Sequence, residues 1–135
     1  TIPLAQAREL MVTAGNTHWP VVLVGDFNST ANDATNPTFA TYRSFIDAGF
    51  VDTWLETQPV NPGFTCCQAP DLLNPDSSLN FRIDLVFVRV GIDVVNASVI
   101  GDKQVDRTPS GLWPSDHAGV TAKLKPDERS KLIRR

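Results

Sequence analysis

Three groups of polar residues interrupt apolar segments of this chain and could support chemistry. Asp26 and Asn28 follow the apolar run 21–24, Asp84 lies inside the apolar segment 81–88, and Asp116 and His117 directly precede the segment 118–124. A carboxylate at the end of a buried strand is costly to desolvate, so it requires a cation, a hydrogen-bond donor or a reacting group nearby. Three acids and one histidine in this setting predict a metal-assisted hydrolase site.

The first group contains two complementary side chains. In extended backbone, residues two apart share a face, so the side chains of Asp26 and Asn28 would lie about 6–7 Å apart. Asp26 could then act as a base or metal ligand, while the Asn28 amide could hold an anionic oxygen. The alternative is an Asx turn that ends the strand, which the same residues suit equally well.

The second and third groups predict a carboxylate–imidazole pair. Asp84 needs a hydrogen-bond donor in so apolar a segment, and two donors are available. A local salt bridge to Arg82 is one possibility; orientation of His117, as in acid–base dyads, is the other. Asp116 and His117 would point to opposite faces of a regular strand, so a shared site requires irregular backbone, which Pro114 favours.

Other reactive side chains are interpreted as structural. We expect His18 to be solvated or structural and Trp113 to pack against the core or its rim. Cys66 and Cys67 are neighbours, and a trans peptide would hold their Cα atoms about 3.8 Å apart, below the usual disulfide range of about 4.4–6.8 Å. The sequence therefore predicts two small packed side chains, and neither a disulfide nor a zinc site.

Hydrophobic periodicity predicts helices and strands in alternation. A helix is expected at about 3–14, a strand buried on both faces at 21–24, and a second helix from Pro37 to a C-cap at Gly49. Segment 50–54 fits a strand or a turn. Further strands are expected at 64–67, 81–88, 94–100 and 118–124, with long loops at 68–80 and 102–114. This order predicts an α/β or α+β fold with helices on one face of the sheet.

Composition narrows the class of protein. With 135 residues, 41% of them hydrophobic and 20% charged, the chain fits one folded domain. The net charge of −3 and the pI of about 5.2 disfavour a large electrostatic surface for nucleic acid. No apolar stretch is long enough to span a bilayer, and the start does not resemble a signal peptide. The chain opens at Thr1, so we expect a processed product or an excised piece.

The motifs together resemble the endonuclease/exonuclease/phosphatase superfamily, the deoxyribonuclease I-like proteins. The resemblance rests on Val24-Gly25-Asp26-Phe27-Asn28, Arg82-Ile83-Asp84 and Ser115-Asp116-His117, in the family's order, and extends over about residues 4–124. It implies a divalent-metal-dependent phosphoric ester hydrolase that cleaves a phosphodiester or phosphomonoester by activated water. It also implies a four-layer αββα sandwich, of which this chain resembles the C-terminal half only.

The resemblance implies a role for each motif residue. Asp26 would align or deprotonate the attacking water, and Asn28 would bind the phosphate. Asp84 would hold His117, which would contact the scissile phosphate as a charged donor or take part in proton transfer. Asp26, Asn28 and Asp116 would bind or orient near the metal, for which oxygen ligands favour Mg²⁺, with Mn²⁺ or Ca²⁺ as alternatives.

Because only the second half is represented, residues 1–125 are expected to form a half-domain and 126–135 a charged tail. The isolated chain should be inactive, and an apolar sheet face should require the N-terminal half or a second copy. A non-catalytic interaction domain and a self-associating half-domain are the alternative functions. Nucleic acid, phospholipid and sugar phosphate all stay open as substrates. The segment around Cys66 and Asp71-Leu72-Leu73-Asn74-Pro75 resembles that of bacterial members and favours export.

Overall fold

The computed structural model describes residues 2–127, and side chains from residue 4 onward. Its elements, in chain order, are α1 (Ile2–Thr13), β1 (Val21–Asp26), α2 (Phe39–Asp47), β2 (Val51–Asp52), α3 (Thr53–Thr57), β3 (Asp84–Arg89), β4 (Ile92–Ile100), the 3-10 helix η1 (Gln104–Asp106) and β5 (Gly119–Pro126). Residues 128–135 of the expected tail lie outside the described part of the chain.

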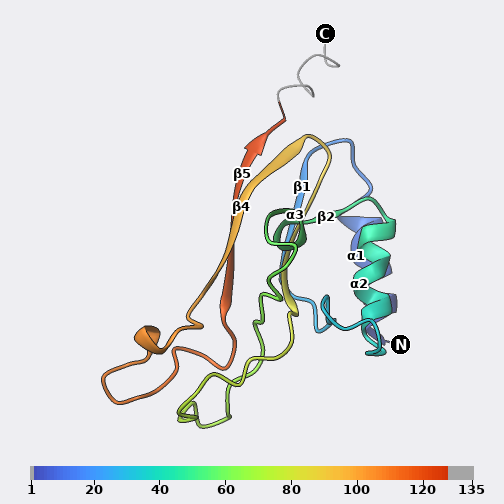
Figure 1. Ribbon diagram of the computed structural model, residues 1–135. Coiled ribbons are helices and arrows are strands. Elements are labelled where there is room, and N and C mark those ends of the chain that lie inside the picture. The colour runs from blue at the N-terminus through green and yellow to red at the C-terminus, as the bar shows by residue number, and fades with distance from the viewer. Residues whose placement is uncertain (1, 128–135) are drawn as a thin grey trace.

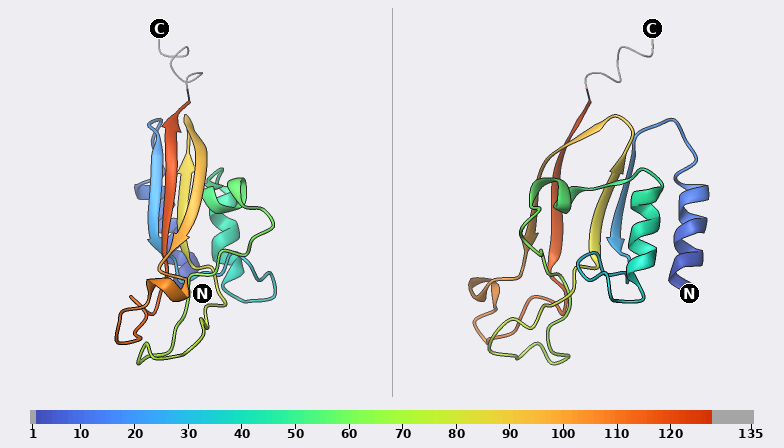
Figure 2. Two further views of the ribbon diagram at one scale, coloured as in Figure 1. Left: turned by 60° about the vertical axis from the view of Figure 1, so that its left-hand side comes forward. Right: turned by 45° about the vertical axis from the view of Figure 1, so that its right-hand side comes forward.

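The strands form two small antiparallel sheets. One has the order β1-β3-β2 and the other is the pair β4-β5. Helices α1 and α2 lie side by side on one face of the three-stranded sheet, and β4-β5 lies on its other side (Figures 1 and 2). Helices, sheet and sheet thus form successive layers, which confirms a mixed α/β fold with helices on one face, consistent with part of a sandwich.

An aromatic core joins the helices to the central strand. Phe87 on β3 is fully buried, and its ring stacks on Phe45 of α2 at 5.0 Å between centroids. Phe27, directly after β1, meets the Phe87 ring edge-on at 5.2 Å. Helix α2 buries Tyr42 and Phe45, three residues apart, because that spacing places both side chains on one helix face.

Burial on both faces is found on β3 but not on β1. Leu85, Val86, Phe87 and Val88 are all buried, because α1 and α2 cover one face of β3 and β5 packs on the other. On the edge strand β1, Val22 and Val24 remain 44% and 69% exposed. The prediction that the 21–24 run is buried on both faces is therefore wrong: β4-β5 covers β3 and leaves these two side chains open.

A buried ion pair fixes the segment that leads into β3. Arg82 Nη1 donates to Asp52 Oδ2 at 2.6 Å, and both side chains are almost completely buried. Tyr42 donates its hydroxyl proton to the same carboxylate oxygen at 3.0 Å, and the other oxygen accepts from the amide of Trp54 in the first turn of α3. The expected alternative, a local bridge from Arg82 to Asp84, is thus excluded, because the guanidinium extends into the core instead.

Two short segments differ from the expected strands. Residues 64–67 do not form a strand; Cys66 alone makes isolated bridges to Phe81 and His117. Segment 50–54 splits into the two-residue strand β2 and the start of α3. Pro62 and Pro70, on the two sides of segment 64–67, limit how far a sheet ladder can extend there.

Candidate functional site

The first two carboxylates are brought together by strand pairing. In the antiparallel register of β1 and β3, Asp26 at the end of β1 is the direct partner of Asp84 at the start of β3. The strand β5 begins at Gly119, two residues after His117. The end of β1 and the starts of β3 and β5 lie at the same end of the molecule (Figure 2). Sheet topology therefore gathers residues that are far apart in sequence.

Asp84 and His117 form the predicted pair. The Nδ1 atom of His117 lies 2.8 Å from Oδ2 of Asp84, and the two side chains are 25% and 19% exposed. Ligand atoms of Asp26, Asp84 and His117 all lie within 4.8 Å of one another. Because Nδ1 is bound to Asp84, Nε2 is the ring nitrogen left to face a substrate or ligand.

The electrostatic surroundings favour the charged imidazole. Partial burial lowers the pKa of His117, but the hydrogen bond to Asp84 and the negative charges of Asp84, Asp116 and Asp26 together outweigh it. The net result is a pKa raised above the ordinary value of 6.5. The site therefore stabilises a positive charge beside three carboxylates.

Asn28 and Asp116 lie beside this cluster. The backbone N–H of Asn28 donates to Oδ1 of Asp26 at 2.7 Å, so the alternative, an Asx turn, is the conformation found, and the extended backbone assumed for a shared face is wrong. The turn places Asn28 next to the first carboxylate. Asn28 has a φ of 47°, a left-handed conformation that asparagine tolerates better than most residues. Asp116 is exposed; its Oδ1 accepts from the Ser115 hydroxyl at 3.2 Å, and its charge acts on His117.

Thr65 hydrogen-bonds to the backbone segments that carry Asp84 and His117, and the sequence did not predict this role. Its side chain is fully buried, and its hydroxyl oxygen accepts from the backbone N–H groups of Ile83 and Asp84, each at 3.1 Å. Its carbonyl accepts from the N–H of Ala118, next to His117, at 2.8 Å. A threonine in an expected strand gives no sign of such contacts, because they depend on segments that meet only in the fold.

The loop after β1 is also pinned to the segment before β3. Phe27 N–H donates to the Ile83 carbonyl at 2.9 Å, and Ala31 N–H donates to the Arg82 carbonyl at 3.0 Å. The Arg82 amide donates in turn to Asn32 Oδ1 at 2.8 Å. These bonds hold the loop that carries Asn28 against the strand that carries Asp84.

The two long loops are bonded to each other near this end of the molecule (Figure 1). Trp113 is buried, and its indole N–H donates to the Asn74 carbonyl at 2.8 Å. Gln104 donates to the Pro75 carbonyl at 2.6 Å. The packing expected for Trp113 is confirmed, and the loops 68–80 and 102–114 form one connected unit at the same end of the molecule as the site.

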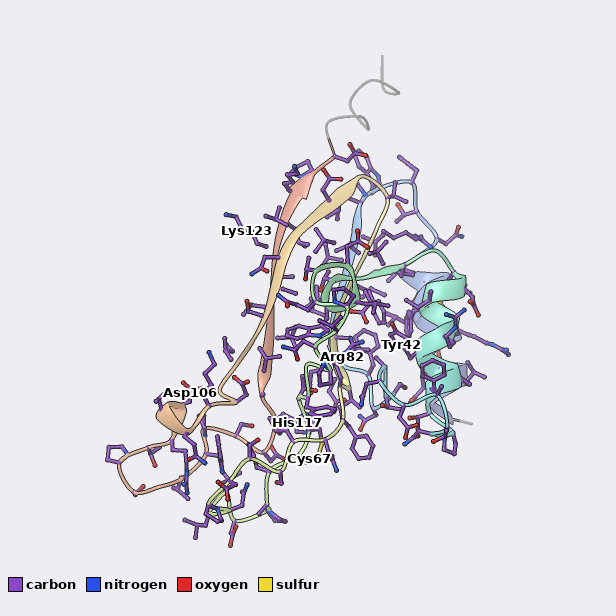
Figure 3. All side chains as sticks on the ribbon, in the orientation of Figure 1. Tyr42, Cys67, Arg82, Asp106, His117 and Lys123 are labelled. Carbon is purple, nitrogen blue, oxygen red and sulfur yellow. A yellow bond between two sulfur atoms is a disulfide. The ribbon has the colours of Figure 1, made fainter. Side chains whose placement is uncertain are left out.

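The structure corrects the prediction for the cysteines. Cys66 and Cys67 are joined by a disulfide, and the peptide bond between them is cis. The prediction of unbonded side chains assumed a trans peptide, with a larger separation than the 3.1 Å found between the Cα atoms. Cys67 Sγ lies 3.9 Å from Nε2 of His117, and Figure 3 shows these two residues together. His18 is exposed beside Trp19, as expected.

Comparison with known proteins identifies the family of this chain. The model of the Endonuclease/Exonuclease/phosphatase family matches residues 1–117. The chain belongs to this family. No curated protein matches it, but solved structures do. One is an endonuclease/exonuclease/phosphatase from Beutenbergia cavernae, 24% identical, with a TM-score of 0.58, which covers 91% of this chain and 31% of its own.

Two further solved structures have the same fold. A mannosyl-6-phosphatase from Bacteroides thetaiotaomicron is 24% identical with a TM-score of 0.57, over 90% of this chain and 43% of its own. TDP2 from D. rerio, complexed with a single-strand DNA product, is 17% identical with a TM-score of 0.62, over 91% and 48%. This chain therefore spans less than half of each compared chain. Within residues 2–127, no helix has the length and apolar character required to cross a membrane.

Proposed function

We propose that this chain carries the C-terminal part of the active site of a metal-dependent phosphoesterase. The observation that carries the proposal is the cluster of Asp26, Asp84 and His117, whose ligand atoms lie within 4.8 Å of one another, in a member of this family. Two carboxylates and an oriented imidazole at one sheet end are the groups that activate water and donate to a phosphate.

Each residue has a role that its position supports. Asp26, exposed at the end of β1, aligns or deprotonates the attacking water. Asn28 follows it in the Asx turn and binds a phosphate oxygen through its amide. Asp84 fixes the His117 ring through Nδ1, so that Nε2 contacts the phosphate as a charged donor or transfers a proton. The raised pKa of His117 suits either role near neutral pH.

The donor set fits a hard cation. Asp26, Asn28 and Asp116 offer carboxylate and amide oxygens, the ligands that Mg²⁺ prefers, with Mn²⁺ and Ca²⁺ as alternatives. When bound, such a cation neutralises charge that develops on the phosphoryl oxygens. The residues of this chain would hold it beside Asp26, while Asp84 keeps His117 oriented for the phosphate.

Strand β1 has apolar side chains on a face that no other element within residues 2–127 covers. Val22 and Val24 are exposed, and each lines a shallow cavity on this side. Val24, Leu85 and Val120 line one of about 160 Å³, and Val22, Ile92 and Leu124 line one of about 240 Å³. We propose that further sequence of a longer protein covers this face, since the compared chains are more than twice as long as the part that this chain matches. A second copy is the alternative.

The substrate is proposed only as a phosphate ester. The compared structures bear the names of a sugar-phosphate phosphatase and of a protein with a DNA product, and a shared fold does not choose between them. The connected loops 68–80 and 102–114 lie at the same end of the molecule as the site, and they are the elements that we propose set the choice.

The test is hydrolysis of an aryl phosphodiester and an aryl phosphomonoester by the complete protein with Mg²⁺. His117→Asn and Asp26→Asn should each lower kcat by about 10²-fold or more, since acid–base groups contribute about 10²–10⁴-fold. His18→Asn and Asp47→Asn, at exposed positions away from the site, are the matched controls and should retain activity.

The outcomes separate the proposed functions. Activity that requires Mg²⁺ and is lost only in the site variants supports the phosphoesterase. A complete protein without activity on either ester, or one whose activity survives His117→Asn, contradicts it and favours a binding domain on the same scaffold. The chain alone should be inactive, and measurable turnover by it would contradict the need for a covering element.

A further inference from the structure

A second cluster of ligating side chains shares His117. The sulfur atoms of Cys66 and Cys67 and a ring nitrogen of His117 all lie within 4.8 Å of one another, and Cys67 Sγ is 3.9 Å from Nε2. Neither cysteine has a part in the proposed hydrolysis. We propose that Cys66 and Cys67, when reduced, form with His117 Nε2 a site for a thiophilic divalent cation such as Zn²⁺, and that its occupation blocks hydrolysis.

The ligand types select the class of cation. Two thiolates and one imidazole favour Zn²⁺ and other borderline or soft ions over Mg²⁺, which prefers oxygen. The hydrogen bond from His117 Nδ1 to Asp84 holds the ring with the Nε2 lone pair directed away from the carboxylate. A carboxylate on the far ring nitrogen is the outer contact that metal-bound histidines commonly make. The three ligands leave a fourth position for water.

Main-chain bonds hold the ligands on neighbouring segments whether or not a cation is present. Cys66 exchanges backbone hydrogen bonds with Phe81, at 2.9 and 3.0 Å, and bridges to His117. The Cys67 carbonyl accepts from the Ser78 hydroxyl at 2.8 Å. Gln68 N–H donates to the Asp116 carbonyl at 2.8 Å. The cysteines and the histidine are therefore placed together in advance, and the exposed side of Cys67 gives a cation access.

Reduction controls the site. In the structure the two sulfur atoms are bonded to each other, and a disulfide is a poor metal ligand. A low-molecular-weight thiol can reduce it: two thiol molecules become one disulfide, and Cys66 and Cys67 become thiols. A divalent cation then displaces the two thiol protons and the Nε2 proton of the charged His117 ring, releases them to solvent, and binds the two thiolates and Nε2. In the oxidised form a phosphate competes for His117 Nε2 only with the long contact to Cys67 Sγ at 3.9 Å, whereas in the reduced, metal-bound form the cation occupies Nε2.

Binding is tested on this chain without any enzyme assay. Co²⁺ is titrated into the reduced chain, and thiolate-to-cobalt charge-transfer absorption in the near ultraviolet is recorded. We expect the absorption to saturate at one ion per chain, and to be lost in the oxidised chain and in Cys67→Ser. His117→Asn should weaken Co²⁺ binding, whereas His18→Asn should bind as the unaltered chain does. Absence of the band in the reduced chain, or equal affinity in His117→Asn, would overturn the proposal.

Inhibition is tested on the complete protein and rests on the proposed function. With excess Mg²⁺ present, Zn²⁺ should lower the activity of the reduced enzyme by at least about tenfold, because it removes a group worth about 10²–10⁴-fold. Cys67→Ser and the oxidised enzyme should keep their activity. Equal inhibition of Cys67→Ser would overturn the blocking role. If the complete protein hydrolyses no ester, the phosphoesterase function fails, while the Co²⁺ titration still decides the metal site.

Discussion

The imidazole of His117 is bonded to Asp84 at 2.8 Å although 33 positions separate the two residues. Thr65 explains how they meet: its hydroxyl accepts from the Asp84 amide and its carbonyl accepts from the amide of Ala118, adjacent to His117. The two segments are therefore fixed to one buried residue, and the side-chain pair forms on a prepared backbone.

The first prediction concerns the protonation of His117 in the metal-free chain. Its pKa, measured by NMR titration of the imidazole, should lie above 6.5, because the contacts with Asp84 and the nearby charges outweigh partial burial. Asp84→Asn should lower it, since the carboxylate provides the hydrogen bond and the nearest charge. Assignment of the signals uses His18→Gln. An unchanged pKa in Asp84→Asn would show that the pair does not persist in solution.

The raised pKa of His117 also predicts how the stability of the fold depends on pH. The folded pKa is raised above the unfolded value, so the stabilising contribution of His117 is complete below about 6.5 and is lost as pH rises through the folded pKa. The unfolding midpoint of the unaltered chain should therefore exceed that of Asp84→Asn most at acidic pH, within the range where the chain stays folded. A difference that grows above neutral pH would contradict the sign of the shift.

The second prediction concerns Thr65. Thr65→Val keeps the shape but leaves the amides of Ile83 and Asp84 without their acceptor, which should cost about 1–3 kcal/mol of unfolding free energy. Thr65→Ser retains the hydroxyl and should lose only about 1 kcal/mol for the missing methyl group. In the complete protein, kcat should fall in Thr65→Val and recover in Thr65→Ser, with KM less affected. Equal kcat values in the two variants would show that the Thr65 hydroxyl does not position the site and that Thr65 contributes only packing.

Much of the fold could be predicted because its signals are local. The helix over 3–14, the helix that carries Phe39 and Tyr42, and the later strands follow from hydrophobic spacing. The Asp84–His117 contact could also be predicted from the sequence. A carboxylate in an apolar strand needs a hydrogen-bond donor, and the chain has few candidate side chains for that role. The motif resemblance supplied the family, which the match over residues 1–117 confirms.

What the sequence could not show depends on non-local contacts. Arg82 has Asp84 two residues away, yet it bonds to Asp52, because α2 and β2 enclose that carboxylate with the guanidinium. The exposure of Val22 and Val24 follows from the width of the second sheet, which no local pattern reports. The Cys66–Cys67 disulfide was missed because a cis peptide between non-proline residues is rare.

The third prediction uses the only tyrosine in the sequence. Burial and the negative charge of Asp52 raise the pKa of Tyr42 to about 12, and Arg82 offsets this only in part. Absorbance titration near 295 nm should therefore show ionisation close to pH 12, or at the pH of unfolding if that comes first. Since the folded pKa is raised, stability from this group is complete below about 10 and declines from there towards 12. A midpoint near pH 10 in the folded chain would contradict the buried Tyr42–Asp52 contact.

The fourth prediction compares a buried ion pair with an exposed one. Arg82→Met leaves Asp52 as an uncompensated charge in the core and should cost about 3–5 kcal/mol of unfolding free energy. Arg43→Met removes the partner of Asp47, in a pair whose side chains are 50% and 65% exposed; it should cost about 0.5 kcal/mol or less. Denaturant unfolding with matched m-values measures both. Because Arg82 precedes the site by two residues, its loss should also shift the His117 imidazole signals, whereas Arg43→Met should leave them in place. Similar costs in the two variants would mean that the Arg82–Asp52 pair does not anchor the entry to β3.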